Sequence, residues 1–200
     1  MSPVYQQSPL RRSPVYRKLA GGDIDRASIA AGGNALLDLS LMPRFGLRGK
    51  NAQRWLEDKG LPVPVVNRAE SRADGYWVAR LGATEFWVLA TTELDEQKDM
   101  PVLTAPEPGC YPVHCGESRA WFALAGEARC GVMAKLCGVD LRPMAFAPGT
   151  IVQTSVARVN AVIIFHQLSG MPVFSILSDT ASAEYLWDVL QDAALGQALR

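Results

Sequence analysis

The sequence predicts an α+β fold made of two related halves. From Leu36 onward, segments rich in branched and aromatic residues, which favour strands, alternate with helical patterns. A short motif also occurs twice, 77 residues apart, as Phe45-x-Leu47-x-Gly49 and Phe122-x-Leu124-x-Gly126. In each copy the glycine opens a short helical pattern. The order strand, glycine, helix, glycine and paired strands therefore occurs twice, which is typical of a duplicated unit.

Two weaker matches extend the repeat at an offset of 78: Gly60-Leu61 with Gly138-Val139, and Arg80-Leu81 with Arg158-Val159. We expect residues 34–200 to form a single α+β domain with two pseudo-repeated halves. The break between the halves is expected near residues 100–118, where four prolines cluster. Residues 1–33 are expected to form an extended N-terminal arm.

The first half is predicted to contain two extended segments, one helix and one hairpin. The extended segments are 35–41 and 44–47, the helix is 51–59, and the hairpin joins 76–81 to 85–90. Ala52, Trp55 and Leu56 share one face of the helix, so this face is expected to be buried. Gly60 is expected to end the helix, and a proline-rich turn follows it.

The second half is predicted to repeat this order. The pattern predicts a strand over 120–125, a helix over 127–136, strands over 150–157, 159–165 and 172–177, and a helix over 180–195. Leu186, Val189, Leu190 and Ala193 give the last helix an apolar face. Asp179 or Thr180 can cap its start.

The N-terminal arm differs in composition from the rest of the chain. Ser-Pro occurs three times within the first 14 residues, and residues 1–33 hold five basic against two acidic side chains. Proline restrains the backbone and lacks an amide donor, so this segment is expected to be extended. It is either a disordered terminus or an arm that orders on another chain, with Tyr5, Leu10 and Tyr16 as anchors. In the second case, deleting residues 2–20 is expected to weaken assembly and leave the melting temperature nearly unchanged.

Composition excludes several classes of protein. The chain carries 20 Lys plus Arg against 20 Asp plus Glu, so it has no overall charge to attract nucleic acid or an anionic membrane. The longest uncharged stretch, 159–178, is interrupted by polar residues and does not resemble a membrane span. Prolines and arginines occupy the position where a signal peptide needs an apolar region, so a cytoplasmic location is expected.

The motifs of the sequence identify no catalytic, cofactor-binding or metal-binding residue. The sequence has no Gly-x-Gly-x-x-Gly, and its two histidines are His114 and His166. His166 ends an apolar run and is interpreted as a hydrogen-bonded histidine of the core. The strongest candidate is the segment from Cys110 to Cys115, which also holds His114. Its Cys-x4-Cys spacing, with Cys130 and Cys137 further along, does not match the spacing of structural zinc sites.

Five tryptophans, by contrast, provide large aromatic side chains that can anchor a core or a subunit interface. They are Trp55, Trp77, Trp87, Trp121 and Trp187, and each falls within a predicted strand or helix. Aromatic anchors without a visible catalytic group favour a partner-bound subunit over an independent enzyme.

Several motifs, in order along the chain, carry a resemblance to a known family. They are Arg12-Ser13-Pro14, Pro43-Arg44-Phe45-Gly46-Leu47-Arg48-Gly49, Arg80-Leu81-Gly82 with Glu85-Phe86-Trp87-Val88-Leu89, Pro148-Gly149-Thr150 with Ala157-Arg158, and Tyr185-Leu186-Trp187. Over nearly its whole length the chain resembles the gamma subunit of heterotetrameric sarcosine oxidases. It is also similar to the related delta subunit of N-methylglutamate dehydrogenase.

This resemblance implies a non-catalytic accessory subunit of a flavoenzyme that oxidatively demethylates a secondary N-methyl amine such as sarcosine or N-methylglutamate. It implies a fold like the folate-binding domain of aminomethyltransferases. It also implies larger flavin-containing alpha and beta subunits and a small delta subunit as partners. FAD, FMN, NAD, tetrahydrofolate and zinc are expected on those partner chains and none on this one.

Two other classes remain open on the sequence. One is a stand-alone folate-dependent protein of the aminomethyltransferase type, which would need a buried carboxylate directed at a pterin; Asp38 is the acidic residue in the first predicted strand. The other is an assembly factor, which would purify as a monomer. Copurification with flavin-containing chains distinguishes both from an accessory subunit.

Overall fold

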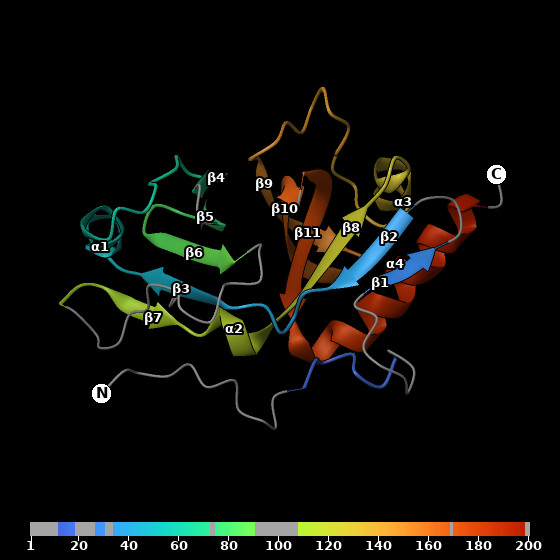
Figure 1. Ribbon diagram of the computed structural model, residues 1–200, viewed down its shortest axis with the longest axis horizontal. Coiled ribbons are helices and arrows are strands. Elements are labelled where there is room, and N and C mark those ends of the chain that lie inside the picture. Colours follow the sequence, from blue (N-terminus) through green and yellow to red (C-terminus); the bar gives the residue numbers. More distant parts are fainter. Residues whose placement is uncertain are drawn as a thin grey trace.

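The computed structural model describes residues 12–18, 27–30, 34–72, 75–90, 108–168 and 170–198. Within these ranges the strands form two antiparallel sheets (Figure 1). The larger sheet has the order β1-β2-β8-β11-β10-β9, and the smaller has the order β4-β5-β6-β3-β7. The strands of the larger sheet are β1 (Ala27–Ala30), β2 (Asn34–Asp38), β8 (Arg119–Ala125), β9 (Ile151–Val156), β10 (Val159–Leu168) and β11 (Met171–Asp179). Those of the smaller are β3 (Arg44–Arg48), β4 (Arg68–Arg72), β5 (Tyr76–Arg80), β6 (Glu85–Ala90) and β7 (Tyr111–Val113).

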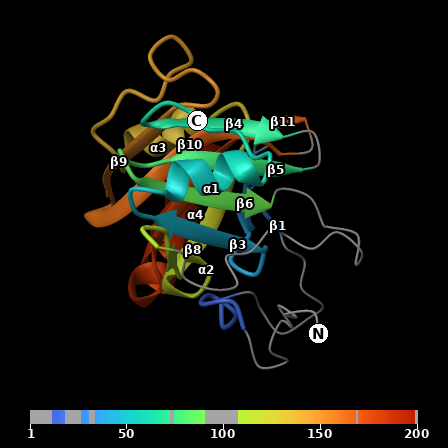
Figure 2. The same ribbon diagram turned by 90° about the vertical axis from the view of Figure 1, so that its left-hand side faces the viewer.

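Helices lie on the outer faces of the sheets. They are α1 (Ala52–Asp58), α3 (Arg129–Ala134) and α4 (Ala183–Ala198), and a one-turn helix α2 (Cys115–Ser118) leads into β8. Figure 2 shows α1 across the outer face of the smaller sheet. Ala52, Trp55 and Leu56 of α1 are buried, as the sequence predicted. Gly60 follows the helix with a φ of 63°, a conformation that favours glycine.

The two halves have the same topology, which confirms the predicted duplication. One unit runs β3, α1, β4, β5, β6 and places its strands in the order β4-β5-β6-β3. The other runs β8, α3, β9, β10, β11 and places its strands in the order β9-β10-β11-β8. Gly49 and Gly126, which end the repeated motif, both have positive φ values, 135° and 108°. The repeated glycines therefore make the same turn from strand to helix.

Each sheet also takes a strand from the segment that precedes the other unit. β2 precedes the first unit in sequence but pairs with β8 of the second. β7 precedes the second unit but pairs with β3 of the first. This exchange interlocks the two halves.

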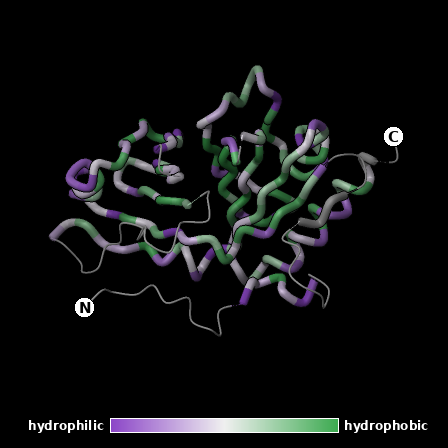
Figure 3. The backbone as a smooth tube through the Cα atoms, in the orientation of Figure 1, coloured by the Kyte–Doolittle hydropathy of each residue, from purple (hydrophilic) through white to green (hydrophobic). Residues whose placement is uncertain are grey.

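Packing follows the alternation of side chains along the strands. Phe45 and Leu47 of β3 face α1, and the rings of Phe45 and Trp55 meet edge to face at 5.9 Å. Phe122 of β8 meets Trp187 of α4 at 5.2 Å in the equivalent layer of the second half. A third hydrophobic cluster fills the space between the two sheets. Figure 3 shows hydrophobic residues concentrated along the strands and hydrophilic ones on α1.

Some predicted details are wrong. The match of Arg80 with Arg158 fails, because Arg80 ends β5 whereas Arg158 lies in the turn before β10, at a φ of 68°. The proline-rich stretch after α1 leads into a strand, β4, which the sequence pattern did not predict. The Cys110 to Cys115 segment contains the edge strand β7.

The N-terminal arm also differs from its prediction. β1 lies within residues 1–33 yet pairs with β2 in the larger sheet. Val15 is completely buried in the core beside α4, and Lys18 forms an ion pair of 2.8 Å with Asp188 of that helix. This part of the arm therefore finds a place to bury an apolar group on its own chain. The predicted anchor Tyr16 is partly exposed, and Tyr5 and Leu10 lie outside the described residues.

Among the described helices, none is both long enough and apolar enough to cross a membrane.

Candidate functional site: the pocket between the two sheets

Strand β3 places three residues on the face that looks toward the other sheet. Arg44, Gly46 and Arg48 alternate with Phe45 and Leu47, which face α1. Gly46 pairs with Trp87 of β6, and Arg48 pairs with Glu85 of the same strand. Because Gly46 has no side chain, the indole of Trp87 can lie over β3. The sequence Arg-Phe-Gly-Leu-Arg thus builds one wall of the space between the sheets.

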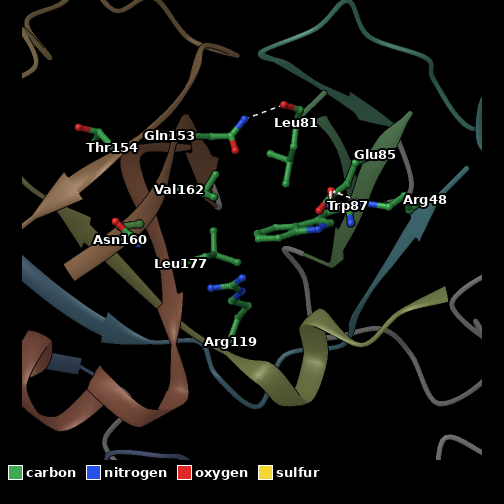
Figure 4. A pocket seen from close by; sticks show the side chains of 11 residues that line it. Arg48, Leu81, Glu85, Trp87, Arg119, Gln153, Thr154, Asn160, Val162 and Leu177 are labelled. Carbon is green, nitrogen blue, oxygen red and sulfur yellow. Dashed lines mark hydrogen bonds and ion pairs between the residues drawn. The ribbon is translucent and has the colours of Figure 1, made fainter. Parts of the chain in front are cut away.

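A cavity of about 410 Å³ opens between the sheets at this wall. We call it the inter-sheet pocket. Its apolar lining comes from both sheets and includes Leu81, Trp87, Val162 and Leu177. Its polar lining includes Arg48, Glu85, Arg119 and Gln153. Figure 4 shows Trp87 across the middle of the pocket, with Arg119 below it.

Two arginines from opposite sheets flank Trp87. Arg48 forms a cross-strand ion pair with Glu85, and Arg119 forms one with Asp179 at the end of β11. The guanidinium carbon of Arg119 lies 6.0 Å from the ring centre of Trp87. Both arginine side chains are partly exposed, with 65% and 34% of their surface accessible. A solute can therefore reach both cations.

One hydrogen bond crosses the pocket. Nε2 of Gln153 in β9 donates to the carbonyl oxygen of Leu81 at 2.6 Å, which ties the larger sheet to the turn between β5 and β6 (Figure 4). The sheets are also joined where β4 approaches the start of β9: the amide of Ala69 donates to Gly149, and that of Ile151 donates to Asn67. These bonds fix the separation of the sheets near the pocket.

The indole N–H of Trp87 is a buried donor without a hydrogen-bond partner in the described part of the chain. Buried polar atoms almost always have a partner, and an exception calls for a physical reason. Cδ1 is the ring atom next to this nitrogen, and a Cβ on Gly46 would lie 3.0 Å from it. The unpaired N–H is therefore in the wall beside Arg48 and Glu85.

Deeper between the sheets, His166 belongs to a hydrogen-bonded chain. Nε1 of Trp121 donates to Oγ of Ser175 at 2.8 Å, and this hydroxyl lies 2.6 Å from Nε2 of His166. Nδ1 of His166 lies 3.0 Å from the carbonyl oxygen of Gln167, which can only accept, so Nδ1 carries the proton. Burial lowers the pKa of His166 to about 4. His166 is thus a neutral, fully buried core histidine, as its place at the end of an apolar run predicted.

Arg44 serves as a structural clamp at the other end of β3. Its guanidinium is buried and donates to backbone carbonyls on both sides of it, those of Ser40 at 2.9 Å and Gly116 at 3.0 Å among them. It thereby ties the loop between β2 and β3 to helix α2. The sequence does not indicate this role, because an arginine in a short strand resembles a surface residue.

In the Cys110 to Cys115 segment the two cysteines are used for packing, whereas the side chain of His114 is exposed. Cys110 and Cys115 are both buried, and burial raises the pKa of the Cys115 thiol to about 11. The carbonyl oxygen of Gly109 accepts from the amide of Asn51 at 2.8 Å, which holds the segment against the turn after β3. Within the described ranges, no three His, Cys, Asp or Glu residues lie close enough together to hold a metal ion.

Asp38, the carboxylate considered for a pterin site, contacts the N-terminal segment instead. Its carboxylate accepts hydrogen bonds from the Ser13 hydroxyl and, at 2.9 Å, from the Ser40 amide. It is almost fully buried in this position.

With this geometry in place, the fold is found to be of the aminomethyltransferase type. No family model and no curated protein sequence matches the chain. Among solved structures, it is similar to a chain of the heterotetrameric sarcosine oxidase from Corynebacterium sp. U-96, with a TM-score of 0.72 and 22% identity, over 94% of this chain and 97% of that one. It is also similar to the glycine cleavage system aminomethyltransferase T from Bartonella henselae, with a TM-score of 0.53 and 17% identity, over 80% of this chain but 46% of that one.

Proposed function

We propose that this protein is a non-catalytic, gamma-type subunit of a heterotetrameric flavoenzyme that oxidatively demethylates a secondary N-methyl amine, such as sarcosine or N-methylglutamate. The observation that carries the proposal is the extent of the structural match. The structural match covers 97% of a chain of the sarcosine oxidase, but less than half of the aminomethyltransferase chain. The chain thus corresponds to a whole polypeptide of a multi-subunit oxidase and to a part of a single-chain transferase.

The contacts of the reactive side chains support an accessory role. The imidazole of His166 is neutral and is hydrogen-bonded to the hydroxyl of Ser175. The carboxylate of Asp38 accepts a hydrogen bond from the hydroxyl of Ser13, and the buried thiol of Cys115 has a raised pKa. Each of these three groups takes part in packing or in a structural hydrogen bond. A catalytic acid, base or nucleophile instead needs to reach a substrate.

The proposal assigns the redox chemistry to other chains. Larger alpha and beta subunits would hold FAD, FMN, NAD and tetrahydrofolate, and a small delta subunit would hold zinc. This chain would contribute surface to the assembly.

The test is to tag the full-length chain in its native host and purify it under mild conditions. We expect larger chains with a flavin absorption spectrum to copurify in a fixed ratio, and anaerobic addition of sarcosine or N-methylglutamate to bleach that spectrum. The chain expressed alone is expected to be colourless and to oxidise neither amine. A tagged form with Val15→Asp, which places a charge in the core, serves as the control for non-specific capture.

Other results would contradict the proposal. A chain that purifies as a monomer without flavoproteins would favour an assembly factor. Tight binding of tetrahydrofolate by the isolated chain would favour a folate-dependent transferase of its own.

A further inference from the structure

We propose that the inter-sheet pocket binds a small carboxylate that has a flat, mainly apolar body. The inference concerns the chain by itself and does not depend on its assembly with flavin-containing subunits. It rests on three features of the pocket: its apolar walls, its two arginines and the unpaired indole N–H of Trp87.

The walls and the volume suit a small planar molecule. The cavity of about 410 Å³ falls in the range of ligand pockets in proteins. Trp87 presents an indole from one sheet, and Val162 and Leu177 present aliphatic groups from the other. A flat ring placed between them would remove apolar surface from water on both of its faces.

The charged groups of the lining favour an anion. Arg48 is paired with Glu85 and Arg119 is paired with Asp179, so these four charges balance, and an anion would be held by the N–H groups that the two pairs do not use. Arg119 donates through one terminal nitrogen to Asp179, and its other N–H groups make no hydrogen bond with described residues. A guanidinium can hold a carboxylate through two parallel hydrogen bonds.

The indole N–H of Trp87 supplies a further donor at the same wall. It is buried without a partner, next to the Arg48 and Glu85 pair. A ligand carboxylate that displaces Glu85 from Arg48 binds the Arg48 guanidinium and accepts a hydrogen bond from this N–H at the same time. A buried donor that gains an acceptor in the complex adds to the affinity and to the selectivity for anions.

The experiment follows the indole N–H signals of the full-length chain by ¹H–¹⁵N NMR during titration with benzoate. The signal of Trp87 is assigned with Trp87→Phe and compared with those of the other four tryptophans. We expect the Trp87 signal to shift most, with a dissociation constant of about 1 mM or below. Benzamide, which has the same shape without the charge, is expected to bind at least about tenfold more weakly.

Matched variants locate the interaction. Arg119→Gln is expected to weaken benzoate binding by about tenfold, whereas Arg142→Gln, whose arginine pairs with Asp140 outside the pocket, is expected to leave it unchanged. The Asp179 released by Arg119→Gln is half exposed, so this variant should fold, and its melting curve checks that it does. Equal binding of benzoate and benzamide, or shifts that spare Trp87, would overturn the proposal.

The proposed ligand is a free molecule, because an acidic side chain of a partner subunit lacks the flat, apolar body. Benzoate binding that persists in the assembled complex supports a free ligand. Binding that is lost on assembly would show that a partner subunit covers the pocket and would overturn a free ligand, as would absence of binding in the isolated chain and in the complex.

Discussion

Gly46 and Trp87 are paired across two neighbouring strands so closely that a Cβ on residue 46 would lie 3.0 Å from Cδ1 of the indole. On its other side, the same Cβ would lie 2.8 Å from Cβ of Val113 in β7. The glycine is therefore required by its neighbours, and its φ is not in the left-handed region. It lets three strands of the smaller sheet converge under the indole that forms the pocket wall.

Replacing Gly46 with alanine is expected to destabilise the fold by about 1 to 3 kcal/mol, because an added methyl overpacks this contact. Urea denaturation followed by tryptophan fluorescence measures the change. Gly138→Ala is the matched control, since a Cβ there meets nothing within 4 Å, and it should leave stability equal or slightly raised. Equal stabilities for the two variants would show that the sheet relaxes around residue 46.

Replacing Arg44 with lysine is expected to cost about 2 to 4 kcal/mol of folding free energy. The lysine keeps the charge but cannot reach carbonyls on two sides, as the planar guanidinium does toward Ser40 and Gly116. Arg54→Lys, at a side chain that is 81% exposed, should change stability by less than about 0.5 kcal/mol. If charge alone mattered at residue 44, the two variants would behave alike.

The sequence predicted the parts of this fold in which a strand or helix carries its own apolar pattern. Phe45 and Phe122 stand out because they face helices, and their spacing from the following glycines identifies the duplicated unit. β4 was missed because its residues, Arg68–Arg72, are largely charged, which suits an outer strand of a sheet but resembles a loop. β7 was missed because it is short and contains Pro112, which edge strands tolerate.

The inter-sheet pocket could not be predicted for a related reason. Its walls come from residues more than 100 positions apart, such as Arg48 and Val162. On one strand, an arginine, a glycine and an arginine at alternate positions indicate exposure to solvent. Only the second sheet, packed against that face, makes Arg48 part of the lining of a cavity.

Stability is expected to fall as the pH is lowered from 6.5 toward 4, because His166 must remain neutral in the folded chain. Its pKa is about 4 when folded, against 6.5 as the ordinary value, so in this window the unfolded chain binds more protons. The loss attributable to this group between pH 7.5 and pH 5 is about 2 kcal/mol. Urea denaturation at both pH values measures it. His166→Gln should flatten this dependence and His114→Gln should preserve it; the same slope in both variants would assign the effect to other groups.

The last prediction concerns the N-terminal segment, for which the structure reverses an expectation drawn from the sequence. Deleting residues 2–20 was predicted to leave the melting temperature nearly unchanged, but Val15 is completely buried beside α4 and Ser13 bonds to Asp38.

Val15→Ala should therefore lower the free energy of unfolding by about 1 to 3 kcal/mol, with a fall in melting temperature of about 2 to 4 °C per kcal/mol. Val65→Ala, at a side chain that is 69% exposed, is the matched control and should change little. The deletion should lower the melting temperature at least as much as Val15→Ala does, because it also removes the Ser13 hydroxyl from the buried carboxylate. A deletion that melts like the full chain would restore the original interpretation, in which the segment matters only to a partner.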